Sequence, residues 1–434
     1  MNYEQLKSAL ASGLYDSAFA YLYGNQDAAI HEARARYASA LEGFLTYFGN
    51  QEELRLFSAP GRCEISGNHT DHQHGRVICC SVSMDIIAVC APTQTGRIRL
   101  KSEGYDKIDD IDLSNLTPQD LEKERSASLI RGIAARMQEL GYPIGGFDAY
   151  TVSSVPAASG ISSSAAFELL VIAILDGLYG DGKMDLIERA KIGQYAENVF
   201  FGKPSGMLDQ CGASIGNLFS LDFKDLKAPS LQQLDIDFAE TGYVVVLSKT
   251  GSHHADLTDE YAAVPREMKQ VAAYLGHEVL REVEEDEFIR KLPDLRAQVG
   301  DRALLRSMHF FEENRRVLRQ IEALKQGDMQ AFLEDVKGSG LSSWTLLQNV
   351  YVANKPHEQA VSLALAISQR LLSEGRGVCR IHGGGFSGTI LAIMKEEAVS
   401  NYISGMEAVF GEGACTRMRV RPVGATEVLS AHRN

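Results

Sequence analysis

The chain has 434 residues, of which 45% are hydrophobic and 23% are charged, a composition that is typical of a folded globular protein and argues against disorder. Its 43 Lys and Arg residues against 57 Asp and Glu residues give a formal net charge of −14, which disfavours nucleic acid as a partner. The seven cysteines show no Cys-x-x-Cys spacing, which disfavours a disulfide framework and a zinc site.

The sequence contains no run of 18 apolar residues and no N-terminal basic region followed by an apolar one, so we expect a cytoplasmic protein without membrane association. At this length, two domains of roughly 200 residues each are expected. We place their boundary in the polar stretch 224–241, which gives domains 1–235 and 236–434.

Apolar periodicity predicts the elements in chain order. In the first domain we expect helices within residues 1–50 and over 126–140, 167–178 and 186–201, and strands over 54–58, 77–82, 86–91, 98–100, 148–155 and 218–223. The second domain should begin with a strand over 243–247, continue as mostly helical sequence to residue 374, and end with strands over 378–381 and 389–393.

Residues 155–166, with the sequence Val-Pro-Ala-Ala-Ser-Gly-Ile-Ser-Ser-Ser-Ala-Ala, join a predicted strand to a predicted helix. The first backbone N–H groups of such a helix are unpaired, and small residues before it let an anion approach closely, which predicts a phosphate site. A helix capped by serine after a Gly-rich turn is an equally good interpretation. The Gly-Lys-Ser/Thr ending of the common phosphate loop is absent, so the neutralising charge must come from a metal or from distant residues.

Two other patterns suggest sites that we disfavour. Gly383, Gly385 and Gly388 fit G-x-G-x-x-G, but a strand follows where a dinucleotide-binding motif requires a helix. The histidine-rich residues 69–74 have no second group of ligands elsewhere, which disfavours a transition-metal site. Short polar side chains on a loop between strands are better suited to a sugar.

Taken together, five motifs in order across residues 37–393 resemble the superfamily of galactokinase, homoserine kinase, mevalonate kinase and phosphomevalonate kinase, and within it the galactokinases. The motifs are Ala59-Pro60-Gly61-Arg62 with Gly67-x-His69-Thr70-Asp71, Pro156-x-x-x-Gly160-Ile161-Ser162-Ser163-Ser164-Ala165, Ala196-Glu197 with Met207-Leu208-Asp209-Gln210, Asp259-Glu260-Tyr261, and Gly384-Gly385-Phe386-x-Gly388. The resemblance implies a two-domain α+β sugar kinase that binds ATP and sugar in the cleft between its domains.

The resemblance also implies a role for each matching residue. Asp209 would accept the proton of the anomeric hydroxyl, and Arg62 would keep that carboxylate ionised and stabilise the transferring phosphoryl group. Ser164 and Glu197 would be Mg²⁺ ligands. The ATP phosphates would lie against residues 158–164, namely Ala158, Ser159, Gly160, Ile161, Ser162, Ser163 and Ser164, with Ser102 near the nucleotide. His69, Asp71 and Tyr261 would contact the sugar.

The sugar signature departs from the galactokinase pattern at Asn68, where these enzymes usually carry a Glu that binds the C6 hydroxyl. We expect a galactose 1-kinase with Asn68 at the sugar. Because neutral Asn68 would not repel a C6 carboxylate, a galacturonate kinase, or a kinase of another C6-variant sugar, is an alternative. A galactose and ATP sensor without turnover is disfavoured, because the central loop, Arg62 and Asp209 are complete. We favour a monomer.

Overall fold

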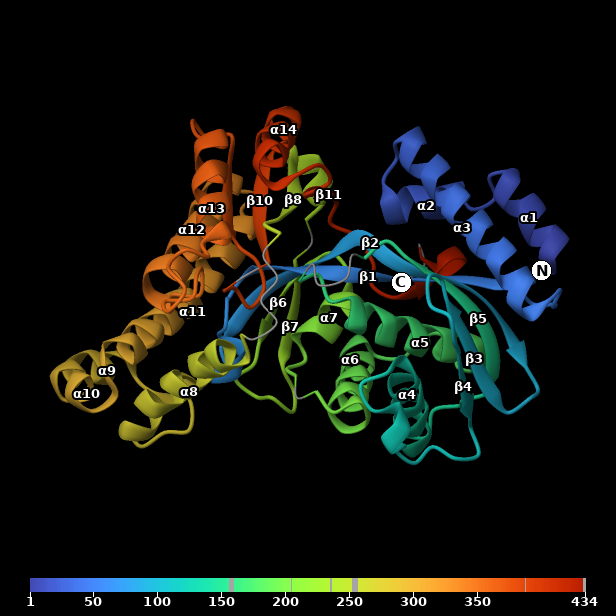
Figure 1. Ribbon diagram of the computed structural model, residues 1–434, viewed down its shortest axis with the longest axis horizontal. Helices are drawn as coiled ribbons and strands as arrows, with labels where there is room; N and C mark the ends of the chain where they lie inside the picture. The colour runs from blue at the N-terminus through green and yellow to red at the C-terminus, as the bar shows by residue number, and fades with distance from the viewer. Residues whose placement is uncertain (156–159, 204, 235, 252–256, 387, 432–434) are drawn as a thin grey trace.

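The structure is a computed structural model that describes residues 1–155, 160–203, 205–234, 236–251, 257–386 and 388–431 (Figure 1). Its larger sheet has eight strands in the order β12-β1-β2-β5-β3-β4, with β6 paired to β2 and β7 paired to β6. Every pairing is antiparallel except that of β3 with β5. The strands are β1 (Arg55–Ser66), β2 (Arg76–Thr93), β3 (Arg97–Ser102), β4 (Ile108–Asp112), β5 (Gly146–Ser153), β6 (Leu218–Asp222), β7 (Ser230–Leu234) and β12 (Thr426–Glu427).

Helices cover both faces of this sheet, because its central strands are apolar on both faces. Along β2, residues 86, 88 and 90 face one core, whereas residues 87, 89 and 91 face another. The first face packs against α4 (Ser126–Glu139), α5 (Ser163–Tyr179) and α6 (Leu186–Tyr195), with α7 (Leu208–Ile215) beside them. The second face packs against the N-terminal helices α1 (Tyr3–Ala11), α2 (Asp16–Tyr23) and α3 (Asp27–Phe48), which lie above the sheet in Figure 1.

The smaller sheet has four antiparallel strands in the order β11-β8-β10-β9. They are β8 (Tyr243–Lys249), β9 (Gly377–Ile381), β10 (Thr389–Lys395) and β11 (Cys415–Met418). One face packs on α13 (Ala360–Leu371) and α14 (Val399–Phe410). The remaining helices form the left side of Figure 1, namely α8 (Thr258–Tyr274), α9 (Glu285–Arg290), α10 (Leu292–Val299), α11 (Asp301–Lys325) and α12 (Met329–Ser342).

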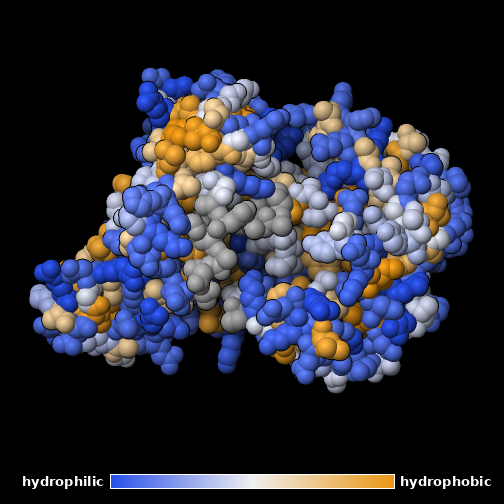
Figure 2. All heavy atoms as spheres, viewed as in Figure 1, coloured by the Kyte–Doolittle hydropathy of each residue, from blue (hydrophilic) through white to orange (hydrophobic). Residues whose placement is uncertain are grey.

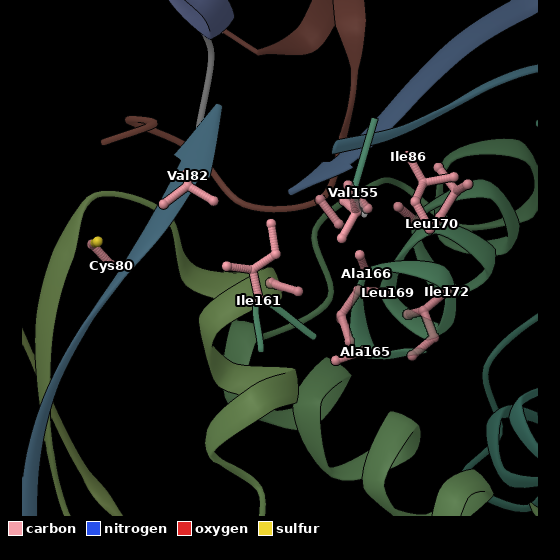
Figure 3. Close-up of a cluster of buried hydrophobic side chains, with 14 of the residues drawn as sticks. Cys80, Val82, Ile86, Val155, Ile161, Ala165, Ala166, Leu169, Leu170 and Ile172 are labelled. Atoms are coloured by element: carbon pink, nitrogen blue, oxygen red, sulfur yellow. The ribbon is translucent and has the colours of Figure 1, made fainter. Parts of the chain in front are cut away.

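A single hydrophobic cluster connects the two sheets. It contains Ile78 and Cys80 of β2, Leu169 of α5, and Val245 and Leu391 of the smaller sheet. Figure 3 shows the part of this cluster near the start of α5. Most of the surface in Figure 2 is hydrophilic, in agreement with the large net charge. An apolar patch is visible at its upper left, where Figure 1 places α13 and α14.

The expected α+β class is confirmed, but several elements differ from the sequence prediction, and β4, β7, β11, β12 and α14 were not predicted. β1 continues through residues 62–66, which were expected in a loop, and β2 is one strand over the two predicted ones. The predicted helix 186–201 ends as α6 and continues as a π-helical turn, η3 (Ala196–Phe201). The chain leaves the larger sheet after β7 and enters the smaller sheet at β8, and β12 near the C-terminus pairs with the larger sheet again. The predicted domain boundary at residue 235 stays a prediction. None of the helices in the described ranges has the length and apolarity needed to cross a bilayer.

Asp85 of β2 ties the N-terminal helices and the C-terminal segment to the larger sheet. Its fully buried carboxylate accepts hydrogen bonds from Arg36 (2.8 Å), Tyr23 (2.6 Å) and Arg421 (3.2 Å). Burial opposes ionisation of Asp85, but the charges of Arg36 and Arg421 outweigh it and hold the pKa of this carboxyl below its usual value. A buried charge paired in this way is strongly destabilising once one partner is removed.

Asp85→Asn should therefore lower the free energy of unfolding by about 3–5 kcal/mol, because it leaves two arginines without their carboxylate. Urea denaturation followed by circular dichroism measures this change. As a control, Asp301→Asn breaks an exposed pair with Arg296 and should shift the midpoint little. Equal midpoints for the two variants would show that Asp85 does not hold these segments together.

Candidate active site

The turn before α5 is the predicted phosphate loop, and the structure describes it from Gly160 onward; Ala158 and Ser159 lie outside the described residues. Gly160 and Ser162 both have left-handed backbone, with φ of 77° and 59°. Ser162 is the N-cap residue, yet its side chain makes no capping hydrogen bond to the helix. The capped-helix alternative is thus wrong for Ser162, and the first N–H groups of α5 keep their capacity to bind an anion.

The loop is docked onto β1 by backbone contacts. Ile161 is fully buried in the hydrophobic core (Figure 3), and its carbonyl oxygen accepts a hydrogen bond from the Arg62 N–H at 3.1 Å. A Cβ atom at Gly61 would lie 2.8 Å from that same oxygen, so the approach requires glycine. Ser163 and Ser164 then form the first turn of α5.

Arg62 of β1 and Asp209 of α7 form the charged centre of the site. The Asp209 Oδ1 atom accepts hydrogen bonds from Arg62 Nε at 2.9 Å and Nη2 at 2.7 Å, and its Oδ2 atom accepts one from the Ser162 hydroxyl at 2.5 Å. Arg62 also donates from Nη1 to the Gly160 carbonyl oxygen at 2.5 Å. The arginine lies flat against α7, where a Cβ at Gly212 would be 2.4 Å from the Arg62 Cβ. These contacts join strand, phosphate loop and helix around one carboxylate.

The electrostatics of this centre favour the ionised carboxylate. Burial opposes the charge on Asp209, but the charge of Arg62 and the hydrogen bonds from Ser162 and Arg62 outweigh it and lower the pKa of the carboxyl below its usual value. The Asp209 side chain remains 33% exposed, whereas that of Arg62 is 9% exposed. The aspartate is therefore the member of the pair that a ligand can reach.

A second acidic centre lies beside the first, at Glu197 of η3. Its carboxylate accepts hydrogen bonds from Ser164 Oγ at 3.4 Å, Lys203 Nζ at 2.8 Å and Gln210 Nε2 at 3.0 Å, and a further one from the Ser205 hydroxyl. A π-helical turn carries Glu197, a feature that often marks functional sites.

The donors at Glu197 suit Mg²⁺ rather than a transition metal. One carboxylate and one hydroxyl are oxygen ligands of the kind Mg²⁺ takes when substrate phosphates and water complete its octahedron. Across the described ranges no three His, Cys, Asp or Glu side chains form a group that could hold a metal ion by themselves. Lys203 on the same carboxylate shows that a positive charge is accommodated there.

Two of the predicted sugar residues, His69 and Tyr261, contact the glycine turn that follows β9. His69 Nε2 lies 2.7 Å from the Gly384 carbonyl oxygen, and the Tyr261 hydroxyl donates to the Gly385 carbonyl oxygen at 2.8 Å. Asp71 is close to the turn before α7, because a Cβ at Gly206 would lie 3.1 Å from the Asp71 Oδ2 atom. The two halves of the chain therefore both contribute to this region.

Asn68 contacts the same glycine turn, but its side chain is enclosed by protein. It is fully buried, and its amide donates to Glu64 Oε1 at 2.9 Å and to the Gly383 carbonyl oxygen at 2.8 Å, while its Oδ1 accepts from Asn349 at 2.8 Å. Glu64 is paired in turn with buried Arg380 at 3.1 Å. The Asn68 amide has its partners within the protein, so the prediction that it contacts the sugar finds no support in these contacts.

Sequence reasoning missed Glu64, Lys203 and Glu168. Glu64 could have been found, because it follows Arg62 by two residues and the alternation of a strand places both on one face. Ser102 of β3 accepts a hydrogen bond from Thr151 Oγ1 at 3.0 Å on β5, the strand that leads to the phosphate loop. Its predicted place near the nucleotide stays a prediction.

Comparisons with known proteins connect this arrangement to an established family. The profile described as GHMP kinases N terminal domain matches residues 128–217, and that of the galactokinase galactose-binding signature matches residues 42–92. The chain is 30% identical to a galactokinase of Actinobacillus pleuropneumoniae over 83% of the chain and 90% of the relative. It is also 30% identical to the galactokinase of Homo sapiens, over 86% of this chain and 92% of the human protein.

Solved structures give the same result at the level of the fold. A Lactococcus lactis galactokinase complexed with galactose matches with a TM-score of 0.74 and 25% identity, over 91% of this chain and all of the other. A Methanococcus jannaschii mevalonate kinase matches with a TM-score of 0.60 and 15% identity, over 85% of this chain and 99% of the other. At this identity the likeness is one of fold alone.

Arg62→Met should raise the pKa of Asp209 relative to the wild type, because burial is then opposed only by the Ser162 hydrogen bond and the charge of Lys203. Titration of the aspartate carboxyl carbons by ¹³C NMR measures the change, and the spectrum of Asp209→Asn identifies the resonance. Arg55→Met is a matched control that breaks the pair with Glu427 at the other end of β1. An Asp209 resonance that titrates alike in Arg62→Met and the wild type would contradict the assigned electrostatics.

Proposed function

The chain belongs to the galactokinase family, and from that premise we propose that it transfers the γ-phosphoryl group of ATP to the anomeric hydroxyl of galactose. The observation that carries the proposal is the position of Asp209. Its carboxylate accepts a hydrogen bond from the Ser162 hydroxyl at the N-terminus of α5, where phosphates would bind, and the turn that leads into its helix lies against Asp71 at Gly206, where a sugar would bind. A hydroxyl in contact with Asp209 would thus face the terminal phosphate.

The electrostatics support direct transfer with Asp209 as the base. A carboxylate that Arg62 keeps ionised is a weak base, and weak basicity suffices because phosphoryl transfer depends mainly on alignment and charge neutralisation. Ser162 orients the second carboxylate oxygen by its hydrogen bond. Arg62, whose Nη1 lies on the phosphate loop, is placed to stabilise charge on the phosphoryl oxygens.

Ser164 and Glu197 would hold the Mg²⁺ that accompanies ATP. When bound, the ion neutralises phosphate charge during transfer. Lys203, which contacts Glu197 and adds to the lowering of the Asp209 pKa, supplies a further positive charge at this end of the site.

The surroundings of Asn68 support a neutral hexose over galacturonate. Glu64, whose charge is paired with Arg380, and the Gly383 carbonyl oxygen accept hydrogen bonds from the Asn68 amide at this corner of the site. Both N–H groups of the amide are therefore used within the protein, and neither is left to donate to a C6 carboxylate. The alternative of a sensor without turnover finds no supporting observation, because the groups of the catalytic centre are assembled.

A sugar panel tests the function. With ATP and Mg²⁺, we expect galactose to give a product phosphorylated at C1, identified by ³¹P and ¹H NMR, and galacturonate to react at least tenfold more slowly. Asp209→Asn should reduce turnover by about 10²–10⁴-fold, because the amide cannot accept the proton. A native circular dichroism spectrum of that variant at the assay temperature is the control for folding, because loss of the pair with Arg62 lowers its melting temperature. ATP-dependent stabilisation by galactose with no phosphorylated product would instead indicate a sensor.

Exchanging the carboxylate of Glu64 and the amide of Asn68 tests the role of this pair. Asn68→Glu alone places two carboxylates in contact and should lower both stability, by about 3 kcal/mol, and kcat/KM for galactose. The double variant Glu64→Asn/Asn68→Glu keeps one carboxylate and one amide, so it should regain most of both. If Asn68→Glu alone improves galactose turnover without loss of stability, Asn68 contacts the sugar after all.

A further inference from the structure

Glu168 is a buried carboxyl group that the proposed mechanism does not use. It lies one turn after Ser164 on the same face of α5 and is fully buried. Its Oε2 atom accepts a hydrogen bond from Gln210 Nε2 at 2.9 Å. The charge of Lys203 on the neighbouring loop acts on Glu168, but Lys203 forms its ion pair with Glu197 and not with Glu168. A fully buried carboxylate without a cation of its own is costly.

Gln210 connects Glu168 to the predicted metal ligand. Its Nε2 atom donates one hydrogen bond to Glu168 and the other to Glu197 Oε2 at 3.0 Å. Both N–H groups of the amide are therefore used. Gly193 of α6 packs closely against this contact, because a Cβ atom at Gly193 would lie 3.1 Å from both Glu168 Oε2 and Gln210 Cγ. The position of the Glu197 carboxylate thus depends on how the Gln210 amide is held.

Two oxygen atoms in this chain of hydrogen bonds are orphaned. Within the described part of the chain, Glu168 Oε1 and Gln210 Oε1 are buried and have no hydrogen-bond partner. If Glu168 is ionised, both are acceptors and neither can satisfy the other. Two buried acceptors without a donor destabilise the folded state.

A single proton on Glu168 would give both of these oxygen atoms a hydrogen-bond partner. A carboxylic acid pairs with a carboxamide at two points, because its O–H donates to the amide oxygen while the amide N–H donates to its carbonyl oxygen. With the proton on Oε1, Glu168 would donate to Gln210 Oε1, the other buried oxygen without a partner, while Oε2 accepts from Nε2. Burial, and after it the charge of Glu197, raises the pKa of Glu168 well above its usual value; Asp209 acts in the same direction, whereas Gln210 and Lys203 oppose it.

We propose that Glu168 is a positioning residue, held as a neutral acid, that fixes the Gln210 amide so that its remaining N–H orients Glu197 toward Ser164. The neutral acid pairs with Gln210 without adding a third negative charge beside Glu197 and Asp209. The link to metal binding rests on the proposed function of Glu197, but the protonation of Glu168 does not.

Infrared difference spectra of wild type minus Glu168→Gln, on the protein without added metal or nucleotide, test the protonation directly. A band of a protonated carboxylic acid is expected for Glu168, and bands of an ionised carboxylate are expected in the matched control with Asp209→Asn. Ionised bands for Glu168 would overturn the proposal. Because this measurement requires no turnover, its result is separable from success or failure of the proposed kinase activity.

The melting temperature gives an independent readout. A proton held by the folded state and released on unfolding makes stability fall as pH rises above the usual glutamate value of about 4.3. Glu168→Gln lacks this proton, so its melting temperature relative to the wild type should rise between pH 5 and pH 8. A constant difference over that range would contradict the neutral acid.

The positioning role is tested by comparing Glu168→Gln with Glu168→Leu in assays with galactose, ATP and a Mg²⁺ titration. The glutamine reproduces both hydrogen bonds, so kcat and the Mg²⁺ concentration for half-maximal rate should stay within twofold of the wild type. The leucine releases Gln210 and should raise that Mg²⁺ concentration about tenfold while KM for galactose changes little. Equal damage from both substitutions would show that the charge of Glu168 is required, and no effect from either would show that it positions nothing.

Discussion

The ion pair between Arg62 and Asp209 is the contact on which the rest of the site depends. It connects β1 to α7, and through Gly160 and Ser162 it also fixes the loop that precedes α5. The loop in turn leaves the start of α5 without a side-chain cap from Ser162, because that hydroxyl is used to hold the aspartate. One guanidinium thus favours the ionised form of the Asp209 carboxyl and also fixes the turn that precedes α5.

The buried acids of this chain show how environment assigns different states to similar groups. Asp85 is surrounded by arginines and a tyrosine and serves to join segments of the fold. Glu64 is paired with Arg380 and holds the amide of Asn68. Glu168 has an amide instead of a cation, and we infer that it is neutral. A carboxyl group becomes a base, a counter-ion or a hydrogen-bond donor according to its neighbours.

Sequence reasoning predicted the fold class, most strands and helices, and the residues that meet at the charged centre. Arg62 and Asp209 are 147 residues apart, so no local pattern pairs them, and their association came from the family resemblance. The orientation of Asn68 could not be predicted, because Gly383 and Asn349 hold it from 315 and 281 residues away. Likewise, the unpaired oxygens of Glu168 and Gln210 become visible only after α5 and α7 are packed together.

The most direct test of the central claim is a crystal structure of the protein with galactose, Mg²⁺ and a non-hydrolysable ATP analogue. We predict that the anomeric hydroxyl lies within hydrogen-bonding distance of the Asp209 carboxylate, with the terminal phosphate between Arg62 and the N-terminus of α5. A galactose whose anomeric carbon points away from Asp209, or phosphates that bind elsewhere than at α5, would contradict the account.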